Sequence, residues 1–369
     1  MGIRDATLDF GVVHSTVPAA AAAVFTRNAF CGHPVTVGRE HVADGRLQTV
    51  VVNSKNANVA TGPGGLEDCR ETCRLVAREL GTAERDVLPC STGVIGRPLP
   101  MDRIRAGAAG LRAELRPGAL DGFARAILTT DTHPKVRCTA VGPAVLAGCC
   151  KGAGMIEPNM ATLLAFFFTD AAVSAGELRA ALRAAVDDGF NMVTVDGDTS
   201  TSDTAVVLAN GLAGPVDPGA FAAALRAMAI ELAQEIARDG EGATTLLEVA
   251  VRGAPDRDAA RRAAKSVANS PLVKTAVWGA DPNWGRVAMA VGKCFDLPLD
   301  PARMRIAFGD VEVYAGGGTG PEALERLASY LRGDRVRIAV DLGLGGAEAT
   351  AWGCDLTPEY VRINGEYTT

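Results

Sequence analysis

Lys151-Gly-Ala-Gly-Met-Ile-Glu-Pro-Asn-Met-Ala-Thr162-Leu-Leu-Ala-Phe-Phe-Phe-Thr-Asp170 joins a glycine-rich turn to an apolar run. The length and aromatic content of residues 163–168 predict a strand that is buried on both faces. Thr162 would stand at the start of that strand. A hydroxyl held on a rigid strand end suits a nucleophile, but β-branched residues also begin strands for purely conformational reasons. The segment alone leaves both interpretations of Thr162 open.

Helices and strands alternate after this segment. Ser174 and Glu177 form a capping box before an apolar series, which predicts a helix toward Asp188. Residues 190–195 are a strand candidate. Asp217 and Pro218 then provide an N-cap and a first-turn proline for a long helix that stops near residue 240.

The C-terminal third has its own set of elements. Alternating apolar residues predict half-exposed strands at 247–251, 305–308 and 336–340. Helices are expected around 257–267 and 321–332. A domain boundary near residue 245 follows, with a layered α/β core at 1–245 and an α+β domain at 246–369.

Composition limits the class of protein. The chain has 369 residues, 48% apolar and 22% charged, as expected of a soluble globular protein with a substantial core. A net charge of −6 argues against nucleic acid or an anionic membrane as the main partner. The nine cysteines include no CxxC pair, and the N-terminus lacks a secretory pattern. These features predict a cytoplasmic protein with reduced thiols.

Eight segments in collinear order resemble the ornithine acetyltransferase family, also called the arginine-biosynthesis glutamate N-acetyltransferases, over almost the whole chain. They are Ser-Thr-Gly-Val-Ile-Gly at 91–96, Thr-Thr-Asp-Thr-His-Pro-Lys at 129–135, residues 151–162, Asp-Gly-Asp-Thr-Ser-Thr-Ser-Asp-Thr at 196–204, Arg-Asp-Gly-Glu-Gly-Ala at 238–243, Asn-Ser-Pro-Leu-Val-Lys-Thr at 269–275, Asp-Pro-Asn-Trp-Gly-Arg at 281–286, and residues 360–369.

The resemblance implies a self-cleaving N-terminal-nucleophile enzyme. The bond between Ala161 and Thr162 would break to give an α chain of residues 1–161 and a β chain of residues 162–369. Both pieces would build a layered αββα-type sandwich core, and the tail of a smaller C-terminal α+β domain would return to the active site. An α2β2 assembly is also implied.

The resemblance assigns catalysis to three residues, with Thr162 as the nucleophile and Thr92 and Gly93 as the oxyanion-hole donors. Cleavage would free an α-amine whose ordinary pKa, about 7.7–8.0, suits a base for its own hydroxyl. Without the family, Thr92 and Gly93 indicate only a tight turn. The substrate-binding residues implied are Thr129, Lys151, Thr162, Glu241, Asn364 and Thr369.

These residue types suit amino-acid substrates, because ammonium and hydroxyl groups bind a carboxylate and a carboxylate binds an amino group. The expected reaction moves acetyl from N2-acetyl-L-ornithine to L-glutamate by a ping-pong route. The resemblance implies no metal and no cofactor, and leaves open acetyl-CoA as an alternative donor. From the residues alone, Lys151 and Glu241 could equally be solvated charges and Thr369 part of a frayed tail.

Departures from the family pattern put the substrate, more than the mechanism, in doubt and keep a specialised acyltransferase of the same family open. Lys55 stands where the family usually has glycine, Val59-Ala60 replaces an Ala-Cys pair, and Cys149-Cys150 takes the place of small apolar residues. The alternatives are a related acyltransferase of specialised metabolism, such as the paralogue of clavulanic acid clusters, an aminopeptidase or amidase, and a non-catalytic binding protein. Asp196-Gly-Asp-Thr199 also resembles a phosphotransferase loop, although a supporting hydrogen-bonded loop is the simpler interpretation.

Overall fold

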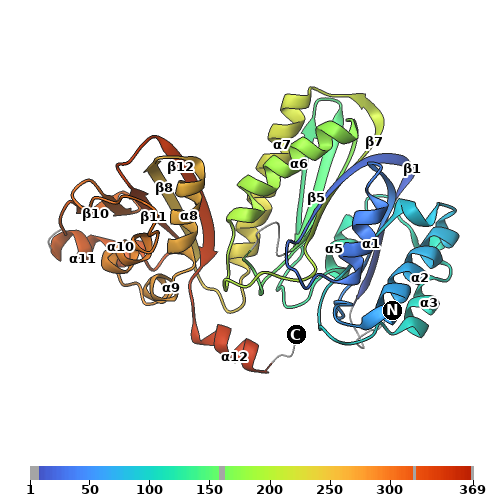
Figure 1. Ribbon diagram of the computed structural model, residues 1–369, viewed down its shortest axis with the longest axis horizontal. Coiled ribbons are helices and arrows are strands. Elements are labelled where there is room, and N and C mark those ends of the chain that lie inside the picture. Colours follow the sequence, from blue (N-terminus) through green and yellow to red (C-terminus); the bar gives the residue numbers. More distant parts are fainter. Residues whose placement is uncertain (1–7, 158–162, 319–320, 367–369) are drawn as a thin grey trace. The chain divides into compact units, whose positions relative to one another are not determined.

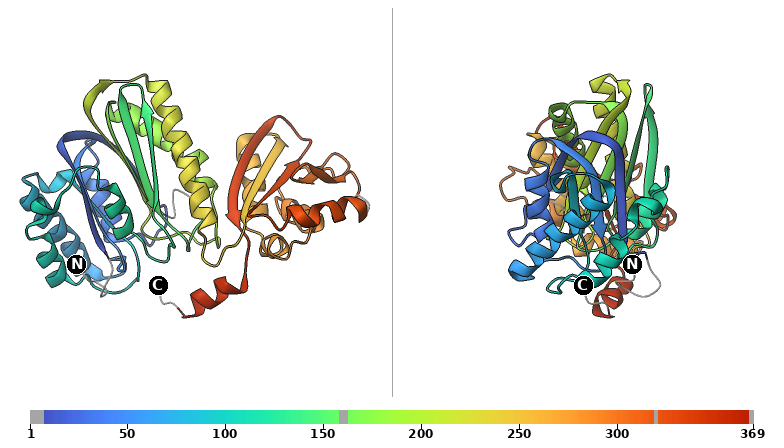
Figure 2. Two further views of the ribbon diagram at one scale, coloured as in Figure 1. Left: turned by 180° about the vertical axis from the view of Figure 1, so that it is seen from behind. Right: turned by 90° about the vertical axis from the view of Figure 1, so that its right-hand side faces the viewer.

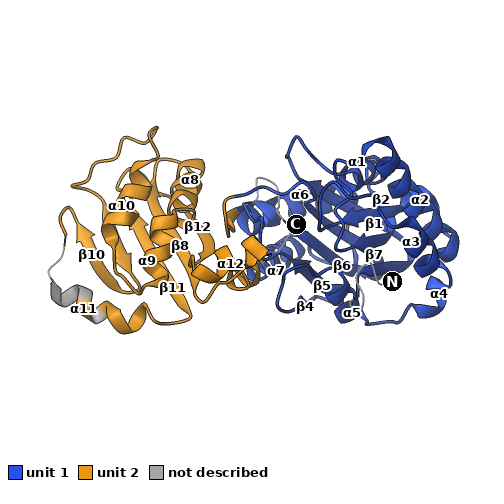
Figure 3. Ribbon diagram, turned by 90° about the horizontal axis from the view of Figure 1, so that it is seen from below, with its two compact units in different colours: residues 1–191, 198–232, 368–369 blue, residues 192–197, 233–367 orange. Residues whose placement is uncertain are grey.

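The computed structural model describes residues 8–157, 163–318 and 321–366 (Figure 1). The chain folds into two compact units (Figure 3). The first contains the chain up to Asn191 together with Asp198–Leu232, and the second contains Met192–Gly197 and the chain from Ala233 to Tyr367. Each unit has its own β-sheet.

The first unit is built on a sheet of seven strands in the order β3-β2-β1-β7-β6-β5-β4. Short 3₁₀ turns occupy Glu84–Asp86 (η1) and Phe190–Met192 (η2). The strands are β1 Phe10–Phe25, β2 Arg46–Asn53, β3 Val87–Ser91, β4 Lys135–Val141, β5 Ala144–Lys151, β6 Leu164–Ala172 and β7 Thr204–Pro215. The helices are α1 His33–His41, α2 Gly62–Leu80, α3 Met101–Ala108, α4 Leu111–Glu114, α5 Leu120–Ala126, α6 Ala175–Asp188 and α7 Pro218–Arg238.

Strand β1 bends sharply and divides this sheet into two arms (Figure 2). Its pairing register with β2 shifts between His14 and Ala19. Before the shift β1 pairs only with β2, and residues 20–25 pair with β7. A bulge of this kind increases local twist and turns a strand, so the arms β3-β2-β1 and β1-β7-β6-β5-β4 can fold toward each other.

The core lies between the two arms. Val50 and Val52 of β2 share one buried cluster with Phe166 of β6 and Val206 of β7. Val51, which points to the opposite face because side chains alternate along a strand, packs in a second cluster with residues of α1 and α2. On the far face of the other arm, an added Cβ at Gly148 would meet Met228 of α7. Helices therefore cover both outer faces, and the layered α/β sandwich is confirmed.

Both sides of residue 162 contribute to the same sheet. Strands β6 and β7 follow this residue, yet they lie between β1 and β5, which precede it. Leu164 pairs with Lys151 on one side and with Thr204 on the other. The core is therefore formed by segments from each half of the chain.

The second unit holds a five-stranded sheet in the order β10-β9-β11-β8-β12. Helix α8 covers it with an alanine-rich face, Ala259, Ala260, Ala263 and Ala264, which is buried against β8 and β12. The strands are β8 Leu246–Ala254, β9 Arg305–Phe308, β10 Val311–Ala315, β11 Arg335–Asp341 and β12 Ala347–Cys354. The helices are α8 Arg257–Ala268, α9 Pro271–Trp278, α10 Trp284–Gly292, α11 Pro321–Tyr330 and α12 Pro358–Glu366.

Most predicted elements are present, including the buried strand (β6), the capped helix (α6), the long helix (α7) and the three C-terminal strands. The strand predicted at 190–195 is wrong. Residues 190–192 form the turn η2, and only Val193 makes an isolated bridge, to Trp352 of β12. The longer segment of the second unit begins at Ala233 within α7, whereas the sequence predicts a boundary near 245. Arg238 at the end of α7 pairs with Asp334, which also belongs to that unit.

The apolar series of α6 and α7 face the sheet, as the buried residues Leu178, Leu182, Phe221 and Leu225 show. These series therefore contribute to the core of the first unit. None of the helices within the described ranges combines the length and the apolar content needed to cross a bilayer.

Candidate active site

Two loops of the first unit meet at one edge of the sheet. Strands β2 and β3 are parallel neighbours with Asn53 opposite Ser91, so the loops that follow them emerge side by side. The Ser91 hydroxyl donates to Asn53 Oδ1 at 2.5 Å, and Asn53 Nδ2 donates to the Asn56 carbonyl at 2.8 Å. Buried polar groups that are fully bonded in this way hold loops in one conformation.

Thr92 and Gly93 lie in the second of these loops. The Thr92 N–H donates to the Asn53 carbonyl at 3.1 Å. Gly93 has φ +127°, and a Cβ at this position would lie 2.3 Å from the Lys55 carbonyl carbon. Within the described parts of the chain, neither the Gly93 N–H nor the Thr92 hydroxyl has a hydrogen-bond partner. Two donors in a tightly fixed turn are therefore available to an external acceptor.

Lys151 and Thr129, which lie far apart in sequence, come together. Lys151 Nζ lies 3.3 Å from the Thr129 hydroxyl oxygen, and the Lys151 residue is only 8% exposed. The Thr129 N–H donates to Asp131 Oδ2 at 3.2 Å. Asp131 Oδ1 accepts from Lys135 Nζ at 2.8 Å and from the Gly152 N–H at 2.6 Å. The aspartate therefore links the 129–135 loop to the glycine turn that follows β5.

Asp131 is ionised within this cluster. Burial alone would raise the pKa of its carboxyl, but Lys135 and Lys151 favour the charged form more strongly and lower the pKa from 3.8 to about 2. Lys55 adds a third ammonium group nearby, donating to the Leu128 carbonyl at 2.6 Å. Three lysines, Lys55, Lys135 and Lys151, thus lie near the segment that carries the Asp131 carboxylate. Ammonium groups gathered in this way attract an anion.

A second carboxyl group, Asp203, lies beside the start of β6. It is 2% exposed, and its Oδ2 atom has no hydrogen-bond partner among the residues that are described. Its neighbour Thr204 donates its N–H to the Leu163 carbonyl at 3.0 Å. Burial raises the pKa of Asp203 well above its ordinary value, although Ser200 and Lys151 act in the opposite direction. Burial therefore favours the protonated form of Asp203.

The Asp196-Gly-Asp-Thr199 loop supports the segment before residue 158. Thr199 pairs with Ile156 in an isolated bridge, and its hydroxyl donates to the Glu157 carbonyl at 2.8 Å. Among the described residues, no group of three or more His, Cys, Asp or Glu side chains could hold a metal ion. The contacts of Thr199 favour the interpretation of this loop as a structural support.

Two predicted substrate-binding residues meet in the second unit. Asn364 Nδ2 on α12 donates to Glu241 Oε2 at 2.8 Å, and Glu241 is 8% exposed. Gly242 has φ +71°, and a Cβ there would lie 2.5 Å from the Tyr360 nitrogen. The glycine therefore lets α12 approach Glu241 closely. Nothing in the sequence spacing of residues 241 and 364 predicted that they would be hydrogen-bonded.

The structure pairs the predicted residues Thr129 with Lys151 and Glu241 with Asn364, and it fixes Thr92 and Gly93 in one turn. Ala161, Thr162 and Thr369 lie outside the described residues. Sequence reasoning missed Asp131, Lys135 and Asp203. Residues 129–134 form no helix, so the spacing of four residues between Asp131 and Lys135 gave no signal for their ion pair. Asp203 was visible only as one acidic residue within a polar loop.

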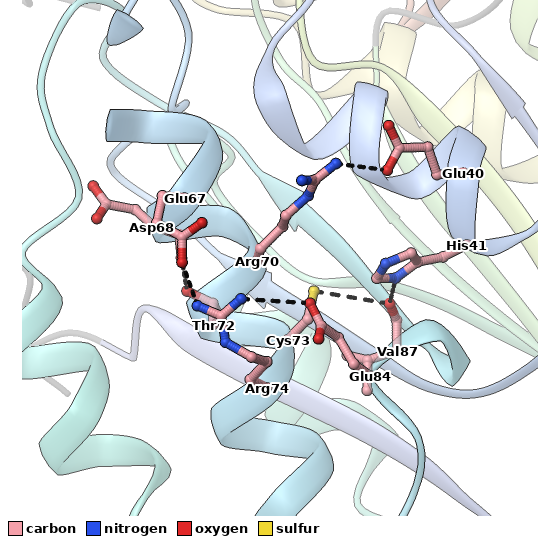
Figure 4. Close-up of polar contacts among 10 residues, drawn as sticks. All are labelled: Glu40, His41, Glu67, Asp68, Arg70, Thr72, Cys73, Arg74, Glu84 and Val87. Atoms are coloured by element: carbon pink, nitrogen blue, oxygen red, sulfur yellow. Dashed lines mark hydrogen bonds and ion pairs between the residues drawn. The ribbon is translucent and has the colours of Figure 1, made fainter. Parts of the chain in front are cut away.

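A cysteine–histidine pair on α1 and α2 lies apart from these residues (Figure 4). His41 Nδ1 and Cys73 Sγ both contact the Val87 carbonyl, at 2.7 Å and 3.9 Å. A hydrogen bond with Cys69, and then burial, raise the pKa of the Cys73 thiol well above its ordinary value. A reactive cysteine needs a lowered pKa, so this pair has the properties of a structural contact rather than of a nucleophile and its base.

These features together define an enzyme-like site on a layered α/β core, with two fixed donors and a buried lysine cluster beside the strand β6. The model of the ArgJ family matches residues 1–369, and the chain belongs to that family.

Two curated relatives match the chain over nearly its full length. The arginine biosynthesis bifunctional protein ArgJ 2 of Nostoc sp. is 51% identical over 100% of this chain and 95% of its own. The glutamate N-acetyltransferase Oat2 of Streptomyces clavuligerus is 53% identical over 98% of this chain and 93% of its own. Among solved structures, the crystal structure of the arginine biosynthesis bifunctional protein argJ of Bacillus halodurans is 43% identical, with a TM-score of 0.53, and it covers 56% of this chain and 100% of that one.

Proposed function

We propose that this protein transfers acetyl from N2-acetyl-L-ornithine to L-glutamate in arginine biosynthesis, through an acetyl ester on Thr162. Membership of the ArgJ family over the whole chain supports the proposal. A relative that is 53% identical bears the name glutamate N-acetyltransferase. The residues that a transfer of this kind requires are present in the sequence, and several of them meet in the described part of the chain.

The observation that carries the proposal is the buried lysine cluster around Thr129 and Asp131. Lys151 pairs in register with Leu164, two residues after Thr162. Its ammonium group contacts the Thr129 hydroxyl and lies close enough to Asp131 to lower the pKa of that carboxyl. A carboxylate bound here would be attracted by these ammonium groups and accept hydrogen bonds from Lys151 and Thr129. Amino-acid substrates carry such a carboxylate close to the amide or amine that reacts.

Thr162 becomes an N-terminal residue by self-cleavage. Its hydroxyl attacks the Ala161 carbonyl, the Ala161–Thr162 amide becomes an ester, and water hydrolyses the ester. The products are a free α-amine on Thr162 and a carboxylate on Ala161. With an ordinary pKa of about 7.7–8.0, a fraction of that amine is neutral near pH 7 and can accept the proton of its own hydroxyl.

The transfer reaction then has two half-reactions. The Thr162 hydroxyl attacks the acetyl carbonyl of N-acetylornithine, the C–N bond breaks, and ornithine leaves with the proton held by the α-amine. The amine of glutamate attacks the resulting ester and regenerates the hydroxyl. The Gly93 N–H and the Thr92 hydroxyl stabilise the oxyanion in both steps, and each such donor contributes about 2.7–4 kcal/mol to transition-state binding.

The remaining assignments belong to the same proposal. Glu241, aligned by Asn364, binds the amino group of the substrate, and Thr369 completes the site. The reaction uses no metal and no cofactor. The α and β pieces stay associated, two of each, in a cytoplasmic enzyme.

Self-processing is tested by intact-mass spectrometry of the purified protein. The wild type is expected as pieces of 161 residues and 369 − 161 = 208 residues, whereas the Thr162→Ala variant stays whole. A wild-type chain that remains intact after prolonged incubation would rule out the self-cleavage step.

The substrates are tested by incubating processed enzyme with a panel of N-acetyl amino acids and with acetyl-CoA, each with and without glutamate. N-acetylornithine with glutamate is expected to give the fastest transfer. A preference for another acceptor would indicate a specialised acyltransferase, and equally fast release of acetate without any amine acceptor would indicate an amidase.

A further inference from the structure

Lys55 occupies a backbone conformation that glycine adopts most readily. Its φ is +74°, in the left-handed region where side chains with a Cβ are disfavoured. A glycine would adopt this conformation without strain. The surrounding structure therefore holds the lysine in a disfavoured backbone conformation.

The backbone of Lys55 packs against the oxyanion turn. The Val94 N–H points to the Lys55 carbonyl at 3.4 Å. A Cβ on Gly93 would lie 2.3 Å from the Lys55 carbonyl carbon and 2.6 Å from its Cα. Since the two segments are in van der Waals contact, a shift of the Lys55 backbone would move the Gly93 N–H.

The side chain of Lys55 reaches the substrate-binding loop. Its ammonium group donates to the Leu128 carbonyl at 2.6 Å and lies 3.4 Å from the Thr129 carbonyl oxygen. The other polar groups of Thr129 are engaged by Asp131 and Lys151. Lys55 therefore contacts the backbone carbonyls of this loop, whereas Asp131 contacts the Thr129 N–H and Lys151 the Thr129 hydroxyl.

We propose that Lys55 is a positioning residue of the acyl-transfer site, which connects the Gly93 oxyanion turn to the Thr129 substrate loop and sets the orientation of the Thr129 hydroxyl. The predicted effect of Lys55 on catalysis rests on the proposed function. Its structural part, the restraint on residues 128–129, stands independently of the reaction. Lys55 acts through Thr129 and Gly93 and is not itself a catalytic residue.

Its neighbour Ser54 supplies a matched control. The Ser54 hydroxyl donates to the Ala126 carbonyl at 2.8 Å, so this side chain also ties the loop after β2 to the end of α5. Among the described residues, its side chain makes no hydrogen bond to Leu128 or Thr129. Ser54→Ala therefore removes a buried hydrogen bond from the same pair of segments but leaves the restraint on Thr129 in place.

The test compares Lys55→Met, Lys55→Arg and Ser54→Ala with wild type in two measurements. In the first, the acetylation of processed enzyme by N-acetylornithine is followed in a single turnover over a range of donor concentrations. Lys55→Met is expected to raise the half-saturating concentration about tenfold, the effect of losing a hydrogen bond to a charged group. Lys55→Arg, which keeps a charged donor, and Ser54→Ala are expected to stay within about threefold of wild type.

The second measurement is hydrogen–deuterium exchange of the peptide that contains Thr129, which requires no activity. Exchange should be faster in Lys55→Met than in wild type or Ser54→Ala. Unchanged exchange and unchanged donor saturation in Lys55→Met would overturn the inference, as would an equal loss in Ser54→Ala or no rescue by arginine. Wild-type enzyme that N-acetylornithine never acetylates would contradict the proposed function instead, while the exchange result would still decide the role of Lys55.

Discussion

At the scale of single residues, several side chains of the candidate site hold its loops in place. Asn53, Ser91 and Asp131 bond to backbone groups or to each other, and they fix the turns that carry Gly93 and Thr129. Asp131 also shows how burial and charge oppose each other, because its two lysine neighbours outweigh the effect of desolvation on its pKa. These contacts predict specific consequences of substitution and of pH.

Gly93→Ala should damage both stability and transfer. The new methyl group would overlap the Lys55 carbonyl carbon, and φ +127° is strained for alanine. We expect a loss of about 1–3 kcal/mol in the free energy of unfolding from the strain. Displacement of the oxyanion donor should lower kcat by about 100-fold or more. Gly96→Ala is the control, since Gly96 also has positive φ but an added Cβ meets nothing within 4 Å. Equal kcat values for the two variants would contradict the role of Gly93.

Asp131 should make stability depend on pH between about 4 and 2. Its folded-state pKa is lowered, so its contribution is fully present above the unfolded-state value near 3.9 and is lost as pH falls through about 2. The contribution is of the order of 2–3 kcal/mol. Denaturant unfolding at pH 5, 3.5 and 2.5 should show this loss in wild type, and Asp131→Asn should lack that component. Parallel pH profiles for the two proteins would refute the assignment.

Residue types could be predicted better than their partners. The family resemblance assigned Thr129, Lys151, Glu241 and Asn364, but the pairing of Glu241 with Asn364 spans 123 positions and needs a three-dimensional contact. The sequence marks Lys55 only as a lysine at a position where the family usually has glycine. Its left-handed backbone and its bond to Leu128 depend on a loop more than seventy residues away, which local sequence does not encode.

At the scale of elements, local signals worked where the chain makes its own stabilising contacts. Helix α6 begins at Ala175 after the Ser174 N-cap, and both hydrogen bonds of the capping box are present. The failed strand at 190–195 has the apolar composition of a strand but lacks a paired neighbour, apart from the single bridge of Val193 to Trp352. Strand formation requires a partner from elsewhere in the chain, and composition does not reveal that partner.

Ser174→Ala should therefore weaken α6 without affecting the chemistry. The variant loses the hydroxyl that accepts from the Glu177 N–H, which should lower the free energy of unfolding by about 1 kcal/mol. Thermal or urea unfolding measures this loss. Acetyl-transfer kinetics below the unfolding transition should match wild type, and a large change in kcat would show that α6 does more than cover the sheet.

At the scale of the whole molecule, the strand order has a consequence for the processed protein. Strands β6 and β7 from the C-terminal piece lie between β1 and β5 from the N-terminal piece, and both edges are hydrogen-bonded. Separation of the pieces would break two strand pairings and expose the buried cluster that contains Phe166 and Val206. The pieces should co-elute in native size-exclusion chromatography and separate only in denaturant. Separate native peaks would contradict the interleaved core.

The central claim is that Thr162 carries the acetyl group between donor and acceptor. Its most direct test is intact-mass spectrometry of processed enzyme given N-acetylornithine without an acceptor. One acetyl group should appear on the piece of residues 162–369, peptide mapping should place it on Thr162, and addition of glutamate should remove it as N-acetylglutamate. If transfer to glutamate proceeds while no acetyl group ever appears on that piece, or if the acetyl group maps to another residue, the account is contradicted.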